Sequence, residues 1–213
     1  MKKFVLLAIS ISIMESCHVP VTRDYQGTSK SLVFTQNKKW LINNMYSDLN
    51  LDQREALNSD VFKTFERLSN GNATRLSTAQ RNALLPGKIS FNPSLEEIQS
   101  LSNSDYDYLV NVYTKKVHDQ IGNVERDRPL QYSKNEAFAE LEVYDLKTSK
   151  RIYFQKASSM MNLDGKKLRD FGDYTTTPQN NRKEGPFLSY SAAQLSVKNV
   201  KKILKDIEKY AVK

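Results

Sequence analysis

Hydrophobic and polar positions alternate along this chain with two periods, and the longer one, close to four residues, predicts three helices. The first begins at a capping-box-like Asp52 with Glu55 three residues later, and it ends at Asn70-Gly71. The second is short and follows Asn92-Pro93, a cap with proline at the first helical position. The third runs from about 188 to 211 and carries a lysine-rich face opposite its apolar stripe. This stripe either packs on the core, which we expect, or lies on an anionic membrane.

The shorter period, in which apolar and polar residues alternate, predicts the strands. A first strand falls at about 39–46 and a short segment at 73–77, and the β-branched and aromatic stretch 107–117 is expected to be a central strand. Residues 139–144 and 151–156 alternate on either side of a polar turn, which predicts a hairpin with one solvent-facing side. The order β-α-β-α-β-β-β-α predicts an α/β (α+β) fold, a mixed sheet of about five strands with packed helices.

Two polar stretches show neither period. Residues 18–31 contain proline and glycine and are expected to form a tether, and residues 162–186 are expected to form a long loop. The loop carries Phe171 and Tyr174 and is followed by Phe187. These three aromatic residues are candidates for binding a partner, because aromatic side chains often anchor interfaces; alternatively, they pack on the edge of the domain.

The first seventeen residues have the layout of an export signal. Two lysines precede an apolar run, 4–14, which is shorter than the about 20 residues that cross a bilayer. Cys17, the only cysteine, follows Ser16, and this stretch resembles the lipobox of bacterial lipoproteins, with Glu15 departing from the usual small or apolar residue. The resemblance implies cleavage after Ser16 and acylation of Cys17. The alternative is a cysteine that stands there by chance.

The chain therefore divides into a lipoprotein signal peptide at 1–16, a lipidated tether at 17–31 and a single globular domain at 32–213. Several acyl chains on Cys17 would form a permanent anchor, since each buried CH₂ contributes about 0.8 kcal/mol. The residue after the cysteine is His18 rather than an aspartate. By resemblance to lipoprotein sorting in enterobacteria, this favours the outer membrane, with the domain facing the periplasm. The expected partners are the lipid bilayer, through Cys17, and an envelope protein.

The charge of the chain limits the classes of partner that it can bind. It holds 32 Lys and Arg against 24 Asp and Glu, a net charge of +8, and the part after the predicted cleavage site has 30 against 23, a net charge of +7. The lysines occur as separate pairs, without a basic stripe interleaved with aromatic residues, so most are expected to be solvated. We expect no binding to nucleic acid, because the chain is exported and lacks such a stripe.

No residue set forms a catalytic or metal-binding motif. The sequence has no Gly-x-Ser-x-Gly, no His-Glu-x-x-His, no phosphate-binding glycine-rich loop and no paired-cysteine site. The histidines, His18 and His118, have no partner by spacing; His118, at a strand end, is the one candidate general base. We therefore expect no catalytic site, no cofactor and no metal. The alternative is a glycan-processing enzyme that uses two of the loop carboxylates, Asp164, Asp170, Asp173 and Glu184.

The element order and the hairpin at 140–156 resemble a group of envelope lipoproteins. This group includes the penicillin-binding-protein activator LpoB, the curli-secretion lipoprotein CsgG and the amino-terminal domain of TolB. The most recognisable piece is a turn that starts at Asp145 and holds Thr148, with Ser149 where the group commonly has glycine. The resemblance covers about 39–211. It implies a non-catalytic binding or scaffold domain in envelope assembly, cell-wall synthesis or secretion, and the alternative is a glycan-binding or glycan-processing envelope enzyme.

Two members of that group are poor guides to function here. A secretion pore needs alternating strands of about 10 residues, whereas 118–136 and 162–186 are polar and irregular. Activation of an inner-membrane synthase from the outer membrane requires a long tether, whereas the expected tether is short. We therefore expect a binding or scaffold role rather than a pore or a close equivalent of LpoB.

Overall fold

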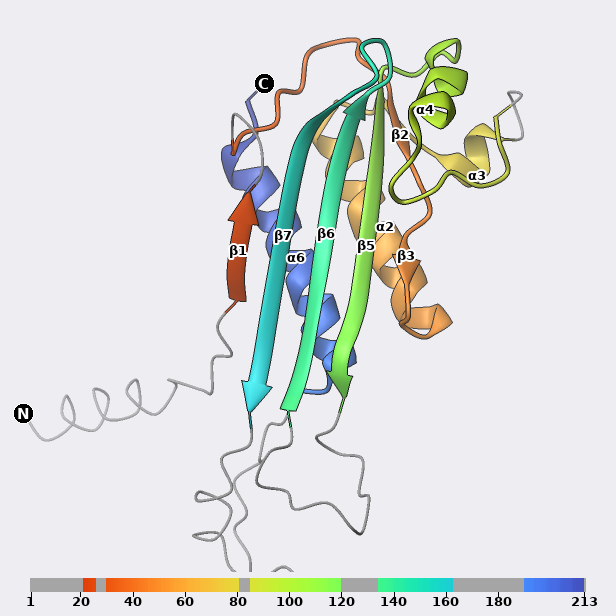
Figure 1. Cartoon of the computed structure of the whole chain (residues 1–213). Coiled ribbons are helices and arrows are strands. Elements are labelled where there is room, and N and C mark those ends of the chain that lie inside the picture. Colours follow the sequence, from red (N-terminus) through yellow and green to blue (C-terminus); the bar gives the residue numbers. More distant parts are fainter. Residues whose placement is uncertain (1–20, 26–29, 81–84, 120–133, 163–189, 213) are drawn as a thin grey trace, which may run out of the picture.

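The computed structural model describes residues 21–25, 30–80, 85–119, 134–162 and 190–212, which form a mixed sheet with helices on both faces (Figure 1). The strands are β1 (Val21–Tyr25), β2 (Trp40–Ile42), β3 (Tyr46–Ser47), β4 (Ala73–Arg75), β5 (Tyr108–Asp119), β6 (Lys134–Asp145) and β7 (Lys150–Asn162). The helices are α2 (Leu51–Leu68), α3 (Leu76–Ala79), α4 (Leu95–Ser102) and α6 (Ala192–Tyr210). The predicted α+β class is confirmed.

The described strands form one open sheet in the order β1-β7-β6-β5-β2-β4, with β3 also pairing with β5. The pairs β5–β6, β6–β7 and β7–β1 are antiparallel, whereas β2 is parallel to both β4 and β5. The predicted hairpin is β6–β7, and both strands are longer than expected. The described part has seven strands rather than about five, because the first predicted strand splits into β2 and β3 and because β1 had been assigned to the tether.

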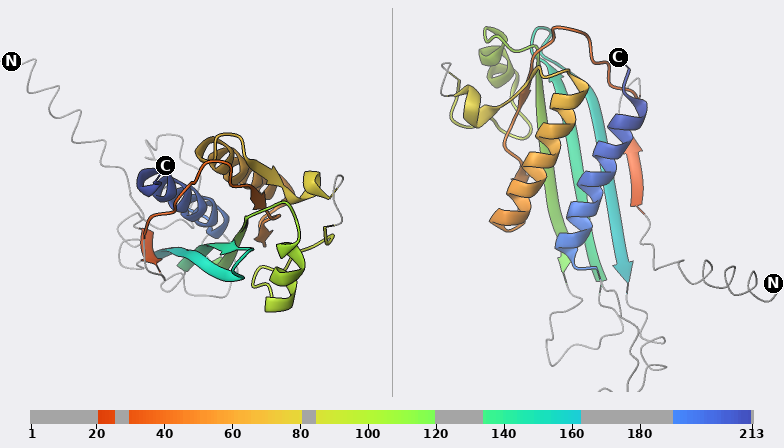
Figure 2. Two further views of the ribbon diagram at one scale, coloured as in Figure 1. Left: turned by 90° about the horizontal axis from the view of Figure 1, so that it is seen from above. Right: turned by 180° about the vertical axis from the view of Figure 1, so that it is seen from behind.

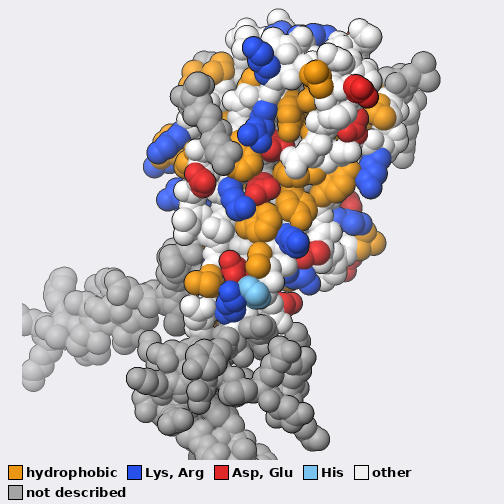
Figure 3. Space-filling model, in the orientation of Figure 1, with side chains coloured by type: hydrophobic (Ala, Val, Ile, Leu, Met, Phe, Trp, Pro, Cys, Tyr) orange, Lys and Arg blue, Asp and Glu red, His pale blue; other side chains and the backbone are white. Residues whose placement is uncertain are grey.

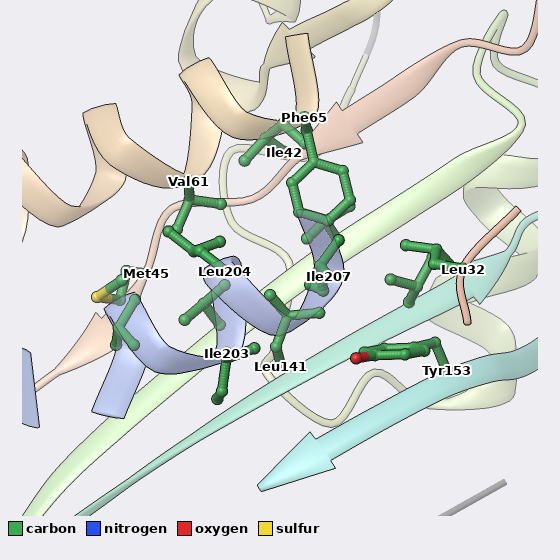
Figure 4. Packing of buried hydrophobic residues seen from close by; sticks show 14 of the residues in the cluster. Leu32, Ile42, Met45, Val61, Phe65, Leu141, Tyr153, Ile203, Leu204 and Ile207 are labelled. Carbon is green, nitrogen blue, oxygen red and sulfur yellow. The ribbon is translucent and has the colours of Figure 1, made fainter. Parts of the chain in front are cut away.

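The helices α2 and α6 cover one face of the sheet, as Figure 2 shows from above. Their apolar stripes meet the inward side chains of β2, β5, β6 and β7 in the main core. Phe65 of α2 and Ile203 of α6 are almost fully buried there, beside Leu141 of β6 (Figure 4). Trp40, the only tryptophan, is fully buried and stacks on Phe34 with ring centroids 4.7 Å apart. The expectation that the last helix packs on the core is confirmed.

Among the described residues, a smaller core covers the opposite face near β2, the start of β5 and the end of β6. It joins α3, α4 and the segment between them to the sheet. Two buried amides hold this segment. Asn43 Nδ2 donates to the carbonyl of Ile89 (2.9 Å) and to Asn111 Oδ1 (2.9 Å), and Asn111 Nδ2 donates to the carbonyl of Phe91 (2.8 Å). Within the described ranges, no helix is both long and apolar enough to cross a membrane.

Two helix starts differ from the predicted ones by two residues. Asn50, not Asp52, caps α2, because its side-chain oxygen accepts from the N–H of Gln53 at 2.9 Å. Ser94, not Asn92, caps α4 and forms a full capping box with Glu97. In both cases a second residue with capping chemistry lies two positions away, so the sequence alone offers two registers for the cap.

The predicted tether is wrong at residues 21–25, which form the edge strand β1. This strand pairs with residues 155–159 of β7 along its whole length. Its side chains alternate: Val21, Arg23 and Tyr25 face α6, and the two between them face the other way. Because the inward positions carry one arginine and one tyrosine, the stretch lacks the apolar alternation by which a strand is recognised.

Candidate functional site

In the described part of the chain, no helix covers the sheet face opposite α2 and α6 over much of β5, β6 and β7, and this region is called the open face below (Figure 1). Strand pairing places its outward side chains in rows that cross the three strands. One row holds Tyr113, Glu140 and Lys156, and the next holds Phe138 and Ser158. Figure 3 shows hydrophobic side chains along this face, flanked by basic and acidic ones.

Three aromatic rings lie on the open face, and the middle one, Tyr113, contacts the other two. Phe91, from the segment before α4, lies with its centroid 5.1 Å from that of Tyr113, and Tyr113 meets Phe138 edge-on at 5.7 Å. Lys156 Nζ stands 4.1 Å from the centre of the Phe138 ring and 2.8 Å from Glu140 Oε1. Such cross-strand aromatic and ionic pairs contribute roughly 0.2–1 kcal/mol each and fix the rings in place. The rings are half-buried, so part of each stays in contact with solvent.

A buried carboxylate borders this row. The side chain of Glu142 is 1% exposed, and it accepts from Arg151 Nη1 at 2.6 Å and from the Tyr144 hydroxyl at 2.8 Å. The Arg151 guanidinium in turn lies 4.9 Å from the centre of the Phe154 ring. Burial, and then the hydrogen bond to Glu142, raise the pKa of the Tyr144 hydroxyl. Glu142 is therefore a bound structural acceptor, because both of its oxygens are already engaged.

His118 also faces outward, at the far end of β5. Its Nε2 lies 3.7 Å from Glu136 Oε2, and Lys134 Nζ lies 3.3 Å from the same oxygen. A general base needs a reacting group within hydrogen-bond reach. The neighbour of His118 is instead the carboxylate of Glu136, which Lys134 also contacts. Among the described residues, no group of three or more His, Cys, Asp or Glu is arranged to hold a metal ion.

At the edge of the sheet, one buried carboxylate joins β1 to α6 and β7. Asp206 of α6 accepts from Arg23 Nη1 at 3.2 Å, from the Tyr25 hydroxyl at 3.0 Å and from Gln155 Nε2 at 2.9 Å. The pKa of Arg23 is raised by its hydrogen bond to Asp206, and burial followed by the same acceptor raises that of Tyr25. This network holds β1 in the sheet, and β1 begins four residues after Cys17.

A polar pocket of about 630 Å³ lies between the β2–β3 segment, the first half of α2 and residues 87–88. It is lined largely by amide, hydroxyl and charged side chains, among them those of Asn43, Asn44, Tyr46, Arg54, Glu55, Asn58, Ser77 and Lys88. The walls are held by internal contacts, since Asn58 Oδ1 accepts from the N–H of Met45 (3.0 Å) and the Tyr46 hydroxyl donates to the carbonyl of Ile89 (2.6 Å).

Most of the functional residues predicted from the sequence lie outside the described ranges. These are Cys17, His18, the aromatic residues Phe171, Tyr174 and Phe187, and the carboxylates Asp164, Asp170, Asp173 and Glu184. Their roles stay predictions. The open face was not among those predictions, and the signal that could have found it is the aromatic content of outward positions in β5 and β6, here Tyr113 and Phe138.

No protein-family model matches the chain, and neither does any curated protein. Among solved structures, the PelC dodecamer from Paraburkholderia phytofirmans is 7% identical, with a TM-score of 0.44 over 91% of this chain and 100% of that one. The hypothetical protein CT253 from Chlamydia trachomatis is 14% identical, with a TM-score of 0.37 over 81% of this chain and 97% of that one. Lipoprotein GNA1162 from Neisseria meningitidis is 10% identical, with a TM-score of 0.33 over 59% of this chain and 83% of that one. The resemblance to LpoB, CsgG and TolB stays a prediction.

Proposed function

We propose that this chain is a lipid-anchored protein of the bacterial envelope whose domain binds a partner protein through the open face. The observation that carries the binding role is the set of three rings, Phe91, Tyr113 and Phe138, on the part of the sheet face that no helix of the described residues covers. Interfaces are enriched in aromatic side chains and arginine, and rings held rigid before binding lose little conformational freedom when a partner docks.

The proposed anchor rests on the lipobox-like stretch that ends at Cys17, and the position of β1 limits how far the domain lies from that residue. Three residues separate Cys17 from Val21, so the sulfur-bearing residue lies within about 14 Å of the sheet even when this stretch is fully extended. The strand is tied to the sheet by five paired residues and to α6 through Asp206. An acylated Cys17 therefore holds this domain against the bilayer, with no long tether between them.

The anchor is tested by metabolic labelling with a fatty-acid analogue. The wild-type chain should incorporate label and float with membranes, and Cys17→Ala should lose both properties. Val19→Ser, a change beyond the predicted cleavage site that leaves the cysteine in place, is the matched control. Unchanged labelling of Cys17→Ala would refute the lipid anchor, whatever the open face binds.

The binding role is tested by site-specific photo-crosslinking in intact cells. A crosslinking amino acid at Lys115 or Ser158, both on the open face, should capture one envelope protein, and the same residue at Lys63, exposed on α2, should not. With that protein purified, Phe138→Ala should raise the dissociation constant at least fivefold, as expected for an interface residue that contributes more than about 1 kcal/mol. Equal capture from Lys63, or unchanged affinity with Phe138→Ala in a folded chain, would refute the open face as the interface.

A second candidate function rests on the polar pocket. Its volume of about 630 Å³ is within the range of small-ligand sites, and its amide, hydroxyl and tyrosine groups are those that recognise sugar hydroxyls. Saturation-transfer NMR with a panel of cell-wall sugars tests this glycan-binding alternative. A signal that disappears in Asn44→Ala, a change of an exposed side chain, would support it, and absence of transfer from every sugar at millimolar concentration would dismiss it.

A further inference from the structure

The exposed face of α6 is unusually basic. It carries Lys198, Lys201, Lys202, Lys205 and Lys209, whereas the opposite stripe, with Val200, Ile203, Leu204 and Ile207, is at most 5% exposed. Because the apolar stripe is fully used by the core, this helix has no apolar face left to insert into a bilayer. Its exposed lysines, Lys201, Lys205 and Lys209, can therefore contact a surface only electrostatically.

Nearby carboxylates neutralise only part of this charge. Asp206 is buried, is bound by Arg23 and also lies 3.8 Å from Lys202 Nζ, and Glu208 is paired with Arg67 of α2. Lys201 stands 3.8 Å from Asp60. Within the described part of the chain, Lys205 and Lys209 have no carboxylate at ion-pair distance; Lys209 lies over the ring of Tyr210. The basic face therefore keeps a net positive charge at neutral pH.

The same helix lies next to the strand that begins four residues after Cys17. Arg23 and Tyr25 of β1 reach Asp206 of α6, and Figure 2 shows β1 alongside α6 when the molecule is seen from behind. The reach of at most about 14 Å from Val21 to an anchored Cys17 is less than twice the distance over which charges act at physiological ionic strength, about 8 Å. An anchor at Cys17 thus keeps α6 near the lipid headgroups, and its lysine face meets them when the domain turns that side to the membrane.

We propose that the lysine face of α6 docks on the anionic headgroups of the membrane that holds the lipid anchor, and so fixes the orientation of the domain. This inference rests on the proposed anchor and adds a second, weaker contact to it. Each lysine near an anionic leaflet strengthens binding by about fivefold, and the contact weakens with salt because it is electrostatic. Stable attachment by two signals of this kind is a general feature of peripheral membrane proteins.

The test uses the processed chain, residues 17–213, with Cys17→Ser, so that no acyl chain contributes. It is sedimented with vesicles of phosphatidylethanolamine and phosphatidylglycerol (70:30) and with neutral phosphatidylcholine vesicles. Replacement of three lysines on the face (Lys201→Gln, Lys205→Gln, Lys209→Gln) should lower the partition coefficient on anionic vesicles by about 100-fold. A matched triple with the same loss of charge on other surfaces (Lys39→Gln, Lys115→Gln, Lys150→Gln) should change it less than fivefold.

Three results decide the matter. A selective loss with the α6 triple, together with release of the parent chain by 0.5 M salt, supports the proposal. Equal loss with both triples would overturn it, because binding would then follow net charge alone; so would absence of binding to anionic vesicles by a chain whose circular dichroism is that of a folded protein. Failure of the anchor is seen separately in the fatty-acid labelling of Cys17→Ala, since the vesicle assay contains no acylated protein.

Discussion

Replacement of Asp206 by alanine should loosen β1 from the domain and cost about 3 kcal/mol of unfolding free energy. The Asp206 side chain is 4% exposed and accepts from Arg23, Tyr25 and Gln155. Hydrogen bonds to a charged group contribute about 1.5–3 kcal/mol each and do not add fully. The Arg23 side chain is 38% exposed and regains water in the variant, whereas the Gln155 amide is fully buried and loses its acceptor, at about 1–3 kcal/mol.

Urea unfolding at pH 7 measures this loss, because Trp40 is the only tryptophan and is fully buried, so its fluorescence reports the main core. Hydrogen exchange then locates the effect, and the amides of 21–25 should exchange much faster in Asp206→Ala. The matched control is Asp60→Ala, which removes an exposed ion pair with Lys201 at 3.8 Å and should cost less than about 0.5 kcal/mol. A loss for Asp206→Ala no larger than that of the control, or unchanged exchange at β1, would refute the reasoning.

Three further changes test the local physics. Ser149 has a φ of 56°, in the left-handed region, so Ser149→Gly should raise the unfolding free energy by about 0.5–1 kcal/mol in urea; a loss would contradict this. Although burial opposes ionisation, hydrogen bonds from the Lys39 N–H and the Lys38 ammonium hold the pKa of Asp107 below its ordinary value, so its stabilisation is present above about pH 4 and is lost as pH falls further. Asp107→Asn should therefore lose less stability than wild type between about pH 4 and 2, and parallel curves would refute this. Burial raises the pKa of Tyr153 above its ordinary value near 10, so above that pH the folded state should lose about 1.4 kcal/mol per pH unit through this group, and Tyr153→Phe should lower the slope by that amount; an unchanged slope would be the contrary result.

The parts of the fold that the sequence predicted are those in which one period covers a whole element. In α2 the apolar positions from Leu57 to Leu68 recur at helical spacing, and Asn70 and Gly71 adopt positive φ after its end, as the stop signal indicated. The parts that it missed depend on tertiary pairing. The strand β1 is held by Arg23 and Tyr25 through a carboxylate 181 or more residues away, and no local pattern announces such a partner.

The turn of the β6–β7 hairpin explains the glycine that the resemblance expected at Ser149. Asp145 Oδ1 accepts from the N–H of Lys147 (2.8 Å) and from that of Thr148 (3.1 Å), which closes the turn and leaves the next residue at φ 56°. A glycine adopts this conformation without steric cost, whereas serine is strained there. The position was therefore readable from the sequence as a turn, although its backbone conformation was not.

The candidate sites were harder to predict, because binding surfaces depend on which face of a strand remains uncovered. The outward rings of Tyr113 and Phe138 occupy positions that, in a strand covered on both faces, would simply be core. Among the described residues, α4 and the segment before it cover this face near β2, the start of β5 and the end of β6 and reach Tyr113 only through Phe91, so those rings stay partly at the surface. The alternation of residues shows that Tyr113 and Phe138 point to the same side of the sheet. Whether that side is core or surface depends on how far the covering layer extends.

The two proposed surfaces lie on opposite sides of one sheet, and this arrangement makes their roles compatible. The helices α2 and α6 form the layer on one side, and the open face is on the other. If the lysine face of α6 lies on the headgroups, the sheet stands between the membrane and the open face, so the rings of Phe91, Tyr113 and Phe138 point away from the bilayer. A partner that reaches them must therefore come from the aqueous side of the envelope. A crosslinker at Ser158 should capture protein and not lipid, whereas one at Lys205 should capture lipid; the reverse pattern would invert the orientation and separate the anchor from the binding role.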